Sequence, residues 1–288
     1  MKRLRGFRAA GVLFAAIFLA ILVQAGIAFA ERWSFAAISD IRPDFAAYTS
    51  VLRQINSGKP EDPGFPRAQL LLAVGDIDPL IRTVIIYQEV MGGDVPFIPV
   101  RGNHEGPEDV RYMLKKVLPG LGIPIEYYDS SSATYYFDWK NARFITIDRY
   151  TDYAGKLRNA VFLQWLEKAI SSAAGADHVF IAFHEPYAPL FPENDPFWKI
   201  LIKHSDKVRA VFNGHIHCYG RHLVPGGRAG IYSINAGNAG SRGHSDGTLT
   251  AVEVSIDGKE VLYRAVQAPH GTRNFAVTDQ WPSPGRGK

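Results

Sequence analysis

The sequence of 288 residues predicts an α/β fold in which strands and helices form layers, and three observations support this prediction. Short apolar runs recur along the chain, and each ends in a loop rich in Gly, Asp, Asn or His. Helical patterns lie between these runs, and alternating strands and helices are typical of layered α/β domains. From Gly230 to Val266 the pattern shows strands alone, which indicates a second sheet and not a simple doubly wound one.

The first 30 residues have the features of a secretory signal peptide. Four basic residues precede a mostly apolar run from Ala9 to Val23, and Ala28-Phe29-Ala30 offers a cleavage site before Glu31. We therefore expect a protein exported to the periplasm or secreted, with no membrane attachment after cleavage. An uncleaved anchor is the alternative, because residues 9–30 are nearly long enough to span a bilayer.

The charge balance gives no reason to expect a nucleic-acid-binding surface. The first 30 residues hold four of the 32 basic residues and no acidic one, so 28 basic residues face 28 acidic ones in the mature chain. A net charge near zero does not attract a polyanion. The single cysteine, Cys218, excludes an internal disulfide, so the stability of the fold has to come from its core.

The mature chain is expected to hold one domain and a tail. Residues 31–270 carry the periodic apolar patterns, and a segment of this length can bury a substantial core without crosslinks. Residues 271–288 are rich in Pro, Gly and polar side chains, so we expect a loosely ordered tail there.

Five apolar runs are predicted as strands that lead into polar loops. The third run contains Pro96 and Pro99, and proline is awkward in a central strand because it cannot donate to the hydrogen-bond ladder. Three more strands are predicted within 230–237, 248–256 and 261–266. The five runs are Trp33–Ile38, Leu70–Val74, Val95–Val100, Val179–Phe183 and Val208–Phe212.

Two helices have clear boundary or face signals. Asp78 is expected to cap a helix that begins at Pro79 and extends to about Met91. The second helix places five apolar residues at a spacing of i, i+3, i+4, i+7 and i+8, and Gly175 would end it. These apolar residues are Phe162, Trp165, Leu166, Ala169 and Ile170.

The loops after the five predicted strands carry side chains of the types that commonly bind metal ions. In open α/β sheets, ligands bind beyond the carboxyl ends of the strands, where such loops converge. Carboxylates, an amide oxygen and imidazoles together suit Zn, Fe or Mn, and one carboxylate can bridge two ions. The residues are Asp40, Asp76, Asn103, His104, His184, His215 and His217.

These residues stand in sequence blocks that resemble the signature blocks of the calcineurin-like metallophosphoesterases. The likeness spans roughly residues 33–240. It implies a four-layer α/β/β/α sandwich with two mixed β-sheets and a metal site at the strand ends. The blocks are Asp40, Gly75-Asp76, Gly102-Asn103-His104-Glu105, His184 and Gly214-His215-x-His217.

The resemblance also implies a role for each residue. Asp76 would bridge two metal ions, Asn103, His184 and His215 would complete one site, and Asp40 and His217 would serve the other. His104 resembles the catalytic general acid. Asn103 and His104 are also expected to contact the substrate, and so is Arg42, for a reason of its own that follows from its departure from the family pattern. The implied activity is hydrolysis of a small phosphomonoester or phosphodiester by metal-activated hydroxide, with one or two Mn, Fe or Zn ions per chain.

The first block departs from the family pattern. Most members read Asp-x-His there, whereas this chain has Asp40-Ile41-Arg42, and a guanidinium has no lone pair for a metal. Asp44 and Asp78 are candidate replacement ligands, although a carboxylate near a helix start has an ordinary role there. Two hypotheses follow: the first metal site is weak or selective, or Arg42 replaces part of a metal's charge and binds the substrate phosphate.

Two alternatives stay open beside a hydrolase. Arg42 can mark a non-catalytic protein that keeps the fold and binds a metal or a phosphate without turnover. Residues 243–247 also fit the G-x-S-x-G pattern of serine esterases, in which a strand precedes the serine and a helix follows it. Here a glycine-rich loop precedes the serine and a strand-like run follows, which argues against the esterase.

Overall fold

The computed structural model describes residues 32–58, 64–151, 156–243 and 246–284. The predicted signal peptide lies outside these residues. Within the described ranges, no helix combines the length and the apolar character that crossing a bilayer requires.

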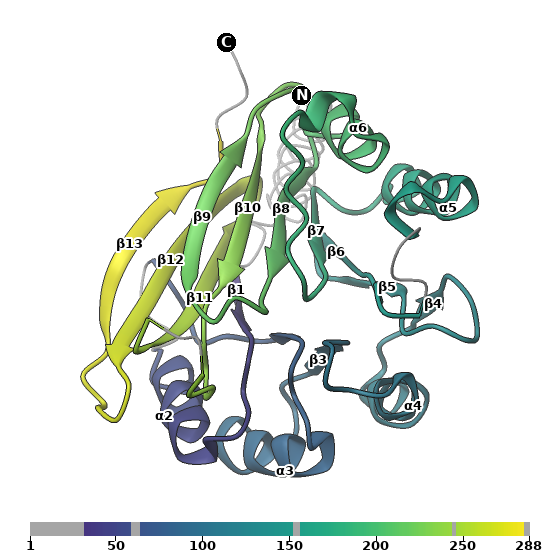
Figure 1. Cartoon of the computed structure of the whole chain (residues 1–288). Helices are drawn as coiled ribbons and strands as arrows, with labels where there is room; N and C mark the ends of the chain where they lie inside the picture. Colours follow the sequence, from purple (N-terminus) through teal and green to yellow (C-terminus); the bar gives the residue numbers. More distant parts are fainter. Residues whose placement is uncertain (1–31, 59–63, 152–155, 244–245, 285–288) are drawn as a thin grey trace, which may run out of the picture. The chain divides into compact units, whose positions relative to one another are not determined.

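The first of two sheets has six strands in the order β13-β12-β11-β1-β2-β3 (Figure 1). Strands β1, β2 and β3 run parallel, while β11, β12 and β13 add antiparallel pairs on the other side of β1. Their bounds are β1 (Trp33–Ile38), β2 (Leu71–Val74), β3 (Phe97–Val100), β11 (Thr248–Asp257), β12 (Glu260–Pro269) and β13 (Ala276–Pro282).

The second sheet has seven strands in the order β4-β5-β6-β7-β8-β10-β9. Its centre, from β6 to β10, is parallel, and antiparallel strands flank it on both sides. Their bounds are β4 (Glu126–Tyr127), β5 (Tyr135–Trp139), β6 (Ala142–Thr146), β7 (His178–Ala182), β8 (Val208–Asn213), β9 (Tyr219–Val224) and β10 (Ile231–Ala236).

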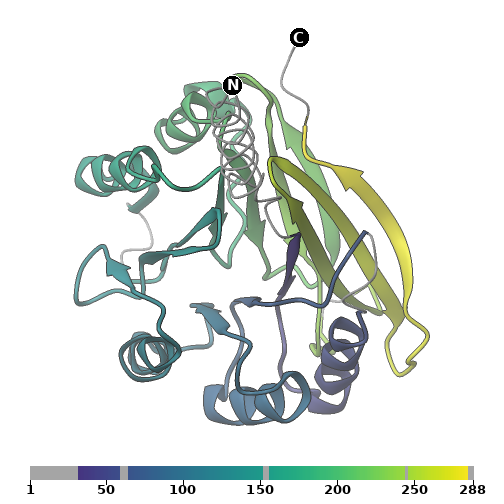
Figure 2. The same cartoon turned by 180° about the vertical axis from the view of Figure 1, so that it is seen from behind.

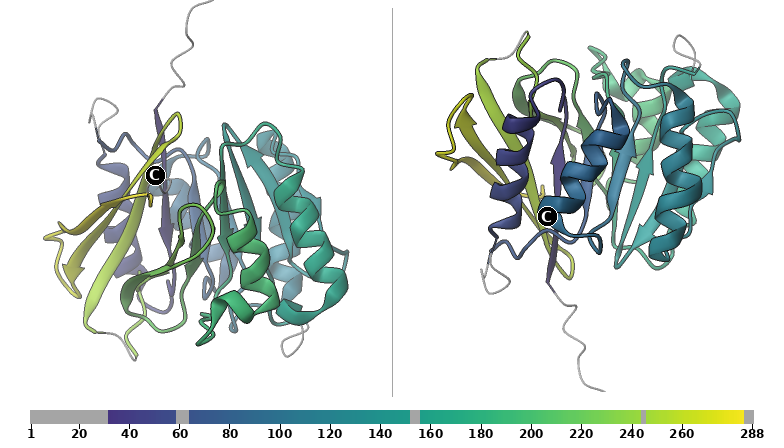
Figure 3. Two further views of the ribbon diagram at one scale, coloured as in Figure 1. Left: turned by 90° about the horizontal axis from the view of Figure 1, so that it is seen from above. Right: turned by 90° about the horizontal axis from the view of Figure 1, so that it is seen from below.

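Helices cover the outer face of each sheet. Helices α2 (Phe45–Asn56) and α3 (Leu80–Met91) pack on the first sheet, and α5 (Ala160–Ser171) and α6 (Pro196–Lys203) pack on the second. Figure 2 shows that α2 and α3 (purple and blue) are separated from α5 and α6 (teal and green). Figure 3 shows both pairs of helices from two further sides. Helix α4 (Pro107–Tyr112) continues into a π-helical turn and a 3-10 turn that end at Leu121.

Strand β1 shows why apolar and polar residues do not alternate along the apolar runs. Phe35 points between the sheets, where its ring lies 5.0, 4.9 and 5.9 Å from the rings of Phe144, Phe180 and Phe212. Ile38 on the opposite face packs with α2. A strand buried on both faces is largely apolar, and each buried ring contributes about 2–3 kcal/mol. The predicted four-layer α/β/β/α sandwich is confirmed.

The proline-containing run forms β3 at the edge of the first sheet. Pro99 pairs in register with Ala73, while Pro96 lies just before the strand. An edge strand tolerates proline because one side of its backbone needs no donor for a neighbouring strand.

Two expectations about the later part of the chain need correction. The predicted second sheet is present, but the strands between residues 230 and 266 are divided between the two sheets: β10 pairs with β8, whereas β11 pairs with β1. The predicted loose tail is wrong for β13, which pairs with β12 and buries Trp281 in a stack on Tyr263.

The predicted start of α3 is displaced by one residue. Pro79 is the N-cap and Leu80 the first helical residue, so Asp78 does not cap this helix. The capping carboxylate instead lies at α2, where Asp44 accepts hydrogen bonds from the backbone N–H groups of Ala46 and Ala47.

Candidate metal centre

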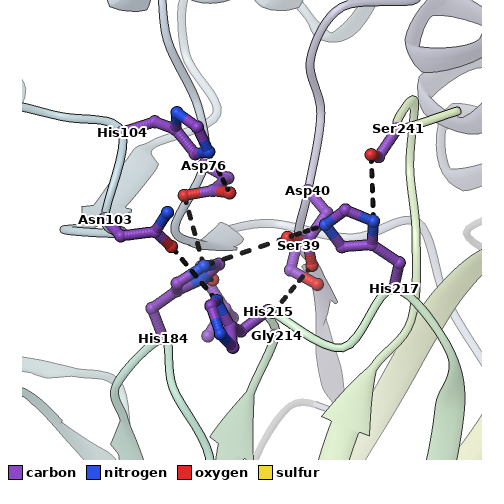
Figure 4. Close-up of polar contacts among 12 residues, drawn as sticks. Ser39, Asp40, Asp76, Asn103, His104, His184, Gly214, His215, His217 and Ser241 are labelled. Atoms are coloured by element: carbon purple, nitrogen blue, oxygen red, sulfur yellow. Dashed lines mark hydrogen bonds and ion pairs between the residues drawn. The ribbon is translucent and has the colours of Figure 1, made fainter. Parts of the chain in front are cut away.

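The seven polar residues predicted from the strand ends come together in the structure (Figure 4). They follow β1, β2, β3, β7 and β8, and within each sheet these strands run parallel, so their carboxyl ends share an edge. The residues are Asp40, Asp76, Asn103, His104, His184, His215 and His217.

Asp76 lies at the centre of this group. Its Oδ1 is 3.2 Å from Nε2 of His184, and its Oδ2 is 3.6 Å from Nε2 of His104. The Asp76 side chain is 5% exposed and that of His184 is fully buried, whereas 44% of the His104 side chain is exposed. Asp76 therefore connects a buried imidazole with a solvent-facing one.

Asp40 links a second set of groups. Its Oδ1 lies 3.2 Å from Nε2 of His217 and 3.9 Å from Nε2 of His184, and its Oδ2 accepts the backbone N–H of His215 at 3.0 Å. One ligand atom each from Asp40, Asp76 and His217 lies within 4.8 Å of the other two. This spacing is suited to a single ion.

Asn103 and His215 lie on the other side of His184. Nδ1 of His215 is 3.1 Å from Oδ1 of Asn103, and the His215 ring stands edge-on to the His184 ring with centroids 5.3 Å apart. The structure thus brings together both groups of residues that the family pattern assigns to metal ions.

Three atoms in the centre are buried without a hydrogen-bond partner among the described residues: Oδ1 of Asp40, Oδ1 of Asp76 and Nε2 of His184. A buried carboxylate oxygen or imidazole nitrogen left in this way costs free energy. All three atoms can donate a lone pair to a cation. A metal ion therefore fits the donor set that these residues present.

The second nitrogens of two histidines support this interpretation. Nδ1 of His184 faces the carbonyl of Val74 at 2.7 Å, and Nδ1 of His217 faces the carbonyl of Gly243. A carbonyl only accepts, so each Nδ1 carries the proton and Nε2 keeps its lone pair in the neutral ring. Metal-binding histidines commonly have this arrangement.

The arrangement of Asp40, Asp76 and His184 favours a positive charge between these side chains. Burial opposes protonation of His184, but its contact with Asp76 and the charge of Asp40 outweigh burial and raise the pKa of His184 to about 9. Burial opposes ionisation of Asp76, yet its contact with His184 lowers the pKa of Asp76 below the usual value. Both pKa shifts favour a positive charge between the two groups, at the position that a cation can take.

The backbone conformation is unusual at these positions. Five non-glycine residues in the described chain have a positive φ, and four of them are Asp40, Asp76, His215 and His217, with φ between 53° and 71°. The left-handed conformation costs about 1–2 kcal/mol per residue. Such strain clusters at functional sites, where it aims side chains that a relaxed turn would not.

Two glycines allow the loops to approach closely. A Cβ on Gly75 would lie 2.3 Å from Nδ1 of His184, and a Cβ on Gly102 would lie 2.3 Å from Oδ1 of Asp76. Neither position can hold a side chain unless these groups move. These steric contacts therefore explain why glycine stands at these positions of the GD and GNHE blocks.

Glu105 is a site residue whose role the sequence did not indicate. Its buried carboxylate accepts the backbone N–H groups of Gly102, Asp76, Ile77 and Asp78 at 2.7–3.1 Å. Burial raises the pKa of Glu105 to about 7. Glu105 joins the loops after β2 and β3. Its place directly after the GNH triplet was the available signal.

Arg42 and the two candidate replacement ligands lie outside the ion-sized cluster. Arg42 donates to Nδ1 of His104 and pairs with Asp78, with its Nε 3.1 Å from Oδ1 of the carboxylate. Asp44 caps α2 and pairs with Arg242. Neither Asp44 nor Asp78 belongs to the cluster of Asp40, Asp76 and His217.

The esterase-like pattern at residues 243–247 is followed by a strand and not by a helix. His244 and Ser245 lie outside the described residues, and the element that follows them is strand β11, which begins at Thr248. A nucleophile elbow requires a helix at that point.

Comparisons with known proteins place this centre in context. A family model described as calcineurin-like phosphoesterase matches residues 34–219. Among solved structures, Vps29 from Entamoeba histolytica complexed with zinc has a TM-score of 0.46 and 12% identity, covering 86% of this chain and 98% of that chain. A predicted phosphoesterase from Streptococcus pneumoniae has a TM-score of 0.42 and 12% identity, covering 88% and 98%. A search of curated protein sequences gives no significant match.

Proposed function

The chain belongs to the calcineurin-like phosphoesterase family, and from that premise we propose that it is a metal-dependent phosphoester hydrolase. The substrate is a small phosphomonoester or phosphodiester, and the cofactor is one or two Mn, Fe or Zn ions. The proposal depends mainly on one observation: buried lone pairs of Asp40, Asp76 and His184 meet without a hydrogen-bond partner among the described residues.

The protein's contribution is to hold donors and substrate in place. Asp40 and His217 are one set of candidate ligands, Asn103, His184 and His215 are the other, and Asp76 serves both. A bound transition metal would supply positive charge that acidifies water and stabilises charge on the phosphate.

His104 is the candidate donor to the departing oxygen. Its Nε2 faces Oδ2 of Asp76 at 3.6 Å, and its partial exposure leaves room for a substrate. A donor at this position matters most when the leaving group is a poor one, such as an alkoxide. Asn103 is a further candidate for contact with the phosphate, because its side-chain amide can donate a hydrogen bond.

The test combines elemental analysis with hydrolysis of p-nitrophenyl phosphate and bis-p-nitrophenyl phosphate, with and without a chelator. We expect bound Mn, Fe or Zn and hydrolysis of one ester that the chelator abolishes. Asp76→Asn and His215→Ala should abolish hydrolysis, while His222→Ala on β9 should not. A protein that binds metal and hydrolyses neither ester would be the non-catalytic binding protein instead.

We also propose export through the N-terminal segment. The support is its basic start, its apolar run and the small residues before Glu31. Expression of the full chain in a bacterium should give a periplasmic or secreted product that begins near Glu31. A product that keeps its N-terminus and stays with the membrane fraction would identify the segment as an anchor.

A further inference from the structure

Arg42 occupies the position where the family pattern has a metal-binding histidine, and its side chain contacts His104. The guanidinium Nη1 lies 2.5 Å from Nδ1 of His104, and Nε lies 3.1 Å from Oδ1 of Asp78. Arg42, Asp78 and His104 come from three different loops, after β1, β2 and β3. A residue that cannot bind the metal thus connects the three loops around the catalytic candidate.

The contact determines which nitrogen of His104 carries the proton. A guanidinium has donors and no acceptor, so Nδ1 of His104 has to present its lone pair to Arg42. In the neutral imidazole the proton is then on Nε2. That nitrogen is the one that faces Asp76 and the metal-ligand cluster. The contact therefore directs an N–H group toward Asp76 and the candidate metal ligands.

The loops hold Arg42 in this orientation. The backbone N–H groups of Asp40 and Ile41 donate to the carbonyls of Gly75 and Asp76 at 3.1 and 3.0 Å, which pairs the first loop with the second. Glu105 then holds the backbone of Asp78. The Arg42 side chain, which is 35% exposed, thus contacts His104 through Nη1 and forms an ion pair with Asp78 through Nε.

We propose that Arg42 is a positioning residue that fixes neutral His104 in the tautomer with the proton on Nε2, so that this N–H donates a hydrogen bond, without transfer of the proton, to the leaving oxygen of the phosphoester. The inference rests on the proposed hydrolase function for its consequence, but the tautomer itself does not depend on turnover. Arg42 accordingly determines how well poor leaving groups are accepted, and it does not stand in for a metal ligand.

The direct test is the tautomer of His104 in protein labelled with 15N-histidine and supplied with Zn²⁺, measured at about pH 8.5. Loss of a signal in His104→Gln assigns the residue. We expect the Nε2–H tautomer in the wild type and a shift toward the other tautomer in Arg42→Met. Arg32→Met removes another arginine whose Nε lies 3.1 Å from an aspartate, and it should leave His104 unchanged. An unchanged tautomer in Arg42→Met would overturn the proposal.

Kinetics provide the second test. Arg42→Met should lower kcat for an alkyl phosphate by ~10-fold or more and for p-nitrophenyl phosphate by less than ~3-fold, because the aryl oxygen needs little help to leave. In the His104→Gln background, Arg42→Met should have little further effect. A rise in KM for both esters that persists in that background would show phosphate binding and overturn the positioning role. If the wild type hydrolyses neither ester, the hydrolase proposal fails and the spectrum alone decides the tautomer.

Discussion

Nε2 of His184 lies 3.2 Å from Oδ1 of Asp76, while Nδ1 of the same ring faces the carbonyl of Val74 at 2.7 Å. If Nδ1 carries the only proton, two lone pairs meet between His184 and Asp76. A positive charge between the two groups would remove this repulsion, which water screens little because both side chains are buried. The fold therefore retains a proton or a cation at this point.

Chelation should reduce the thermal stability of the protein. A cation present at 100 times its dissociation constant contributes ~2.7 kcal/mol, and a domain of this size changes its Tm by ~2–4 °C per kcal/mol. We expect EDTA to lower the Tm by ~5–10 °C in scanning calorimetry. Asp76→Asn should remove this difference, whereas Asp138→Asn, at a carboxylate paired with Arg143, should keep it. Equal Tm values with and without EDTA in the wild type would contradict a metal centre.

Glu105→Gln should destabilise the fold although the side chain keeps its size. The carboxylate accepts four backbone N–H groups, two at each oxygen, and an amide NH₂ would face two of these donors. Leaving buried donors without an acceptor costs ~1–3 kcal/mol, which urea unfolding can measure. Glu89→Gln, at an exposed position of α3, is the matched control. A free energy of unfolding equal to that of the control would refute the structural role of Glu105.

Gly102→Ala should disturb the centre through sterics alone. The added methyl group would lie 2.3 Å from Oδ1 of Asp76 and 2.4 Å from its backbone nitrogen, so the loop after β3 has to move. Overpacking of this kind costs ~1–3 kcal/mol, and the displaced Asp76 should bind metal more weakly. Gly106→Ala in the same loop meets only Asp109, at 3.7 Å, and should be tolerated. Titration with Zn²⁺ compares the two variants, and equal affinities would contradict this account.

Much of the fold could be predicted from the sequence because the apolar runs are buried on both faces. Trp33–Ile38 and Val208–Asn213 are fully buried strands, and each ends where its polar loop begins. Register and neighbours could not be predicted. Which sheet β10 joins, and the pairing of β13 with β12, depend on long-range contacts that a local pattern does not record.

The residue types of the candidate site could be predicted from the sequence. The backbone conformation and the contacts that hold these residues in place could not. Asp76 and His215 could be selected from the sequence because residues of types that bind metals recur directly after the predicted strands. Their left-handed backbone and the role of Glu105 depend on how three loops pack together. Asp44 and Asp78 show the limit most directly: both can cap a helix by sequence, yet only Asp44 does so, and Asp78 pairs with Arg42.

His178 lies at the amino end of β7, the strand whose other end precedes His184. Its Nε2–H donates to the carbonyl of Gly258 at 2.8 Å, and its Nδ1 accepts from Nε of Arg209 at 3.0 Å. Burial and the nearby guanidinium charge outweigh the favourable contact with Gly258 and lower the pKa of His178 to about 4. The neutral ring is therefore part of the folded state.

The stability of the protein should fall as the pH decreases from about 6.5 to about 4, because the unfolded chain accepts a proton on His178 in this range and the folded chain does not. The sign follows from a folded pKa below the unfolded one, and the loss attributable to His178 reaches ~2 kcal/mol at about pH 5. His178→Gln keeps a donor and an acceptor without titrating, so its unfolding free energy should fall ~2 kcal/mol less than that of the wild type between about pH 7.5 and 5. His222→Gln, at an exposed position, should follow the wild type. Urea unfolding at both pH values measures the difference, and parallel losses in wild type and His178→Gln would show that His178 accepts its proton in the folded state.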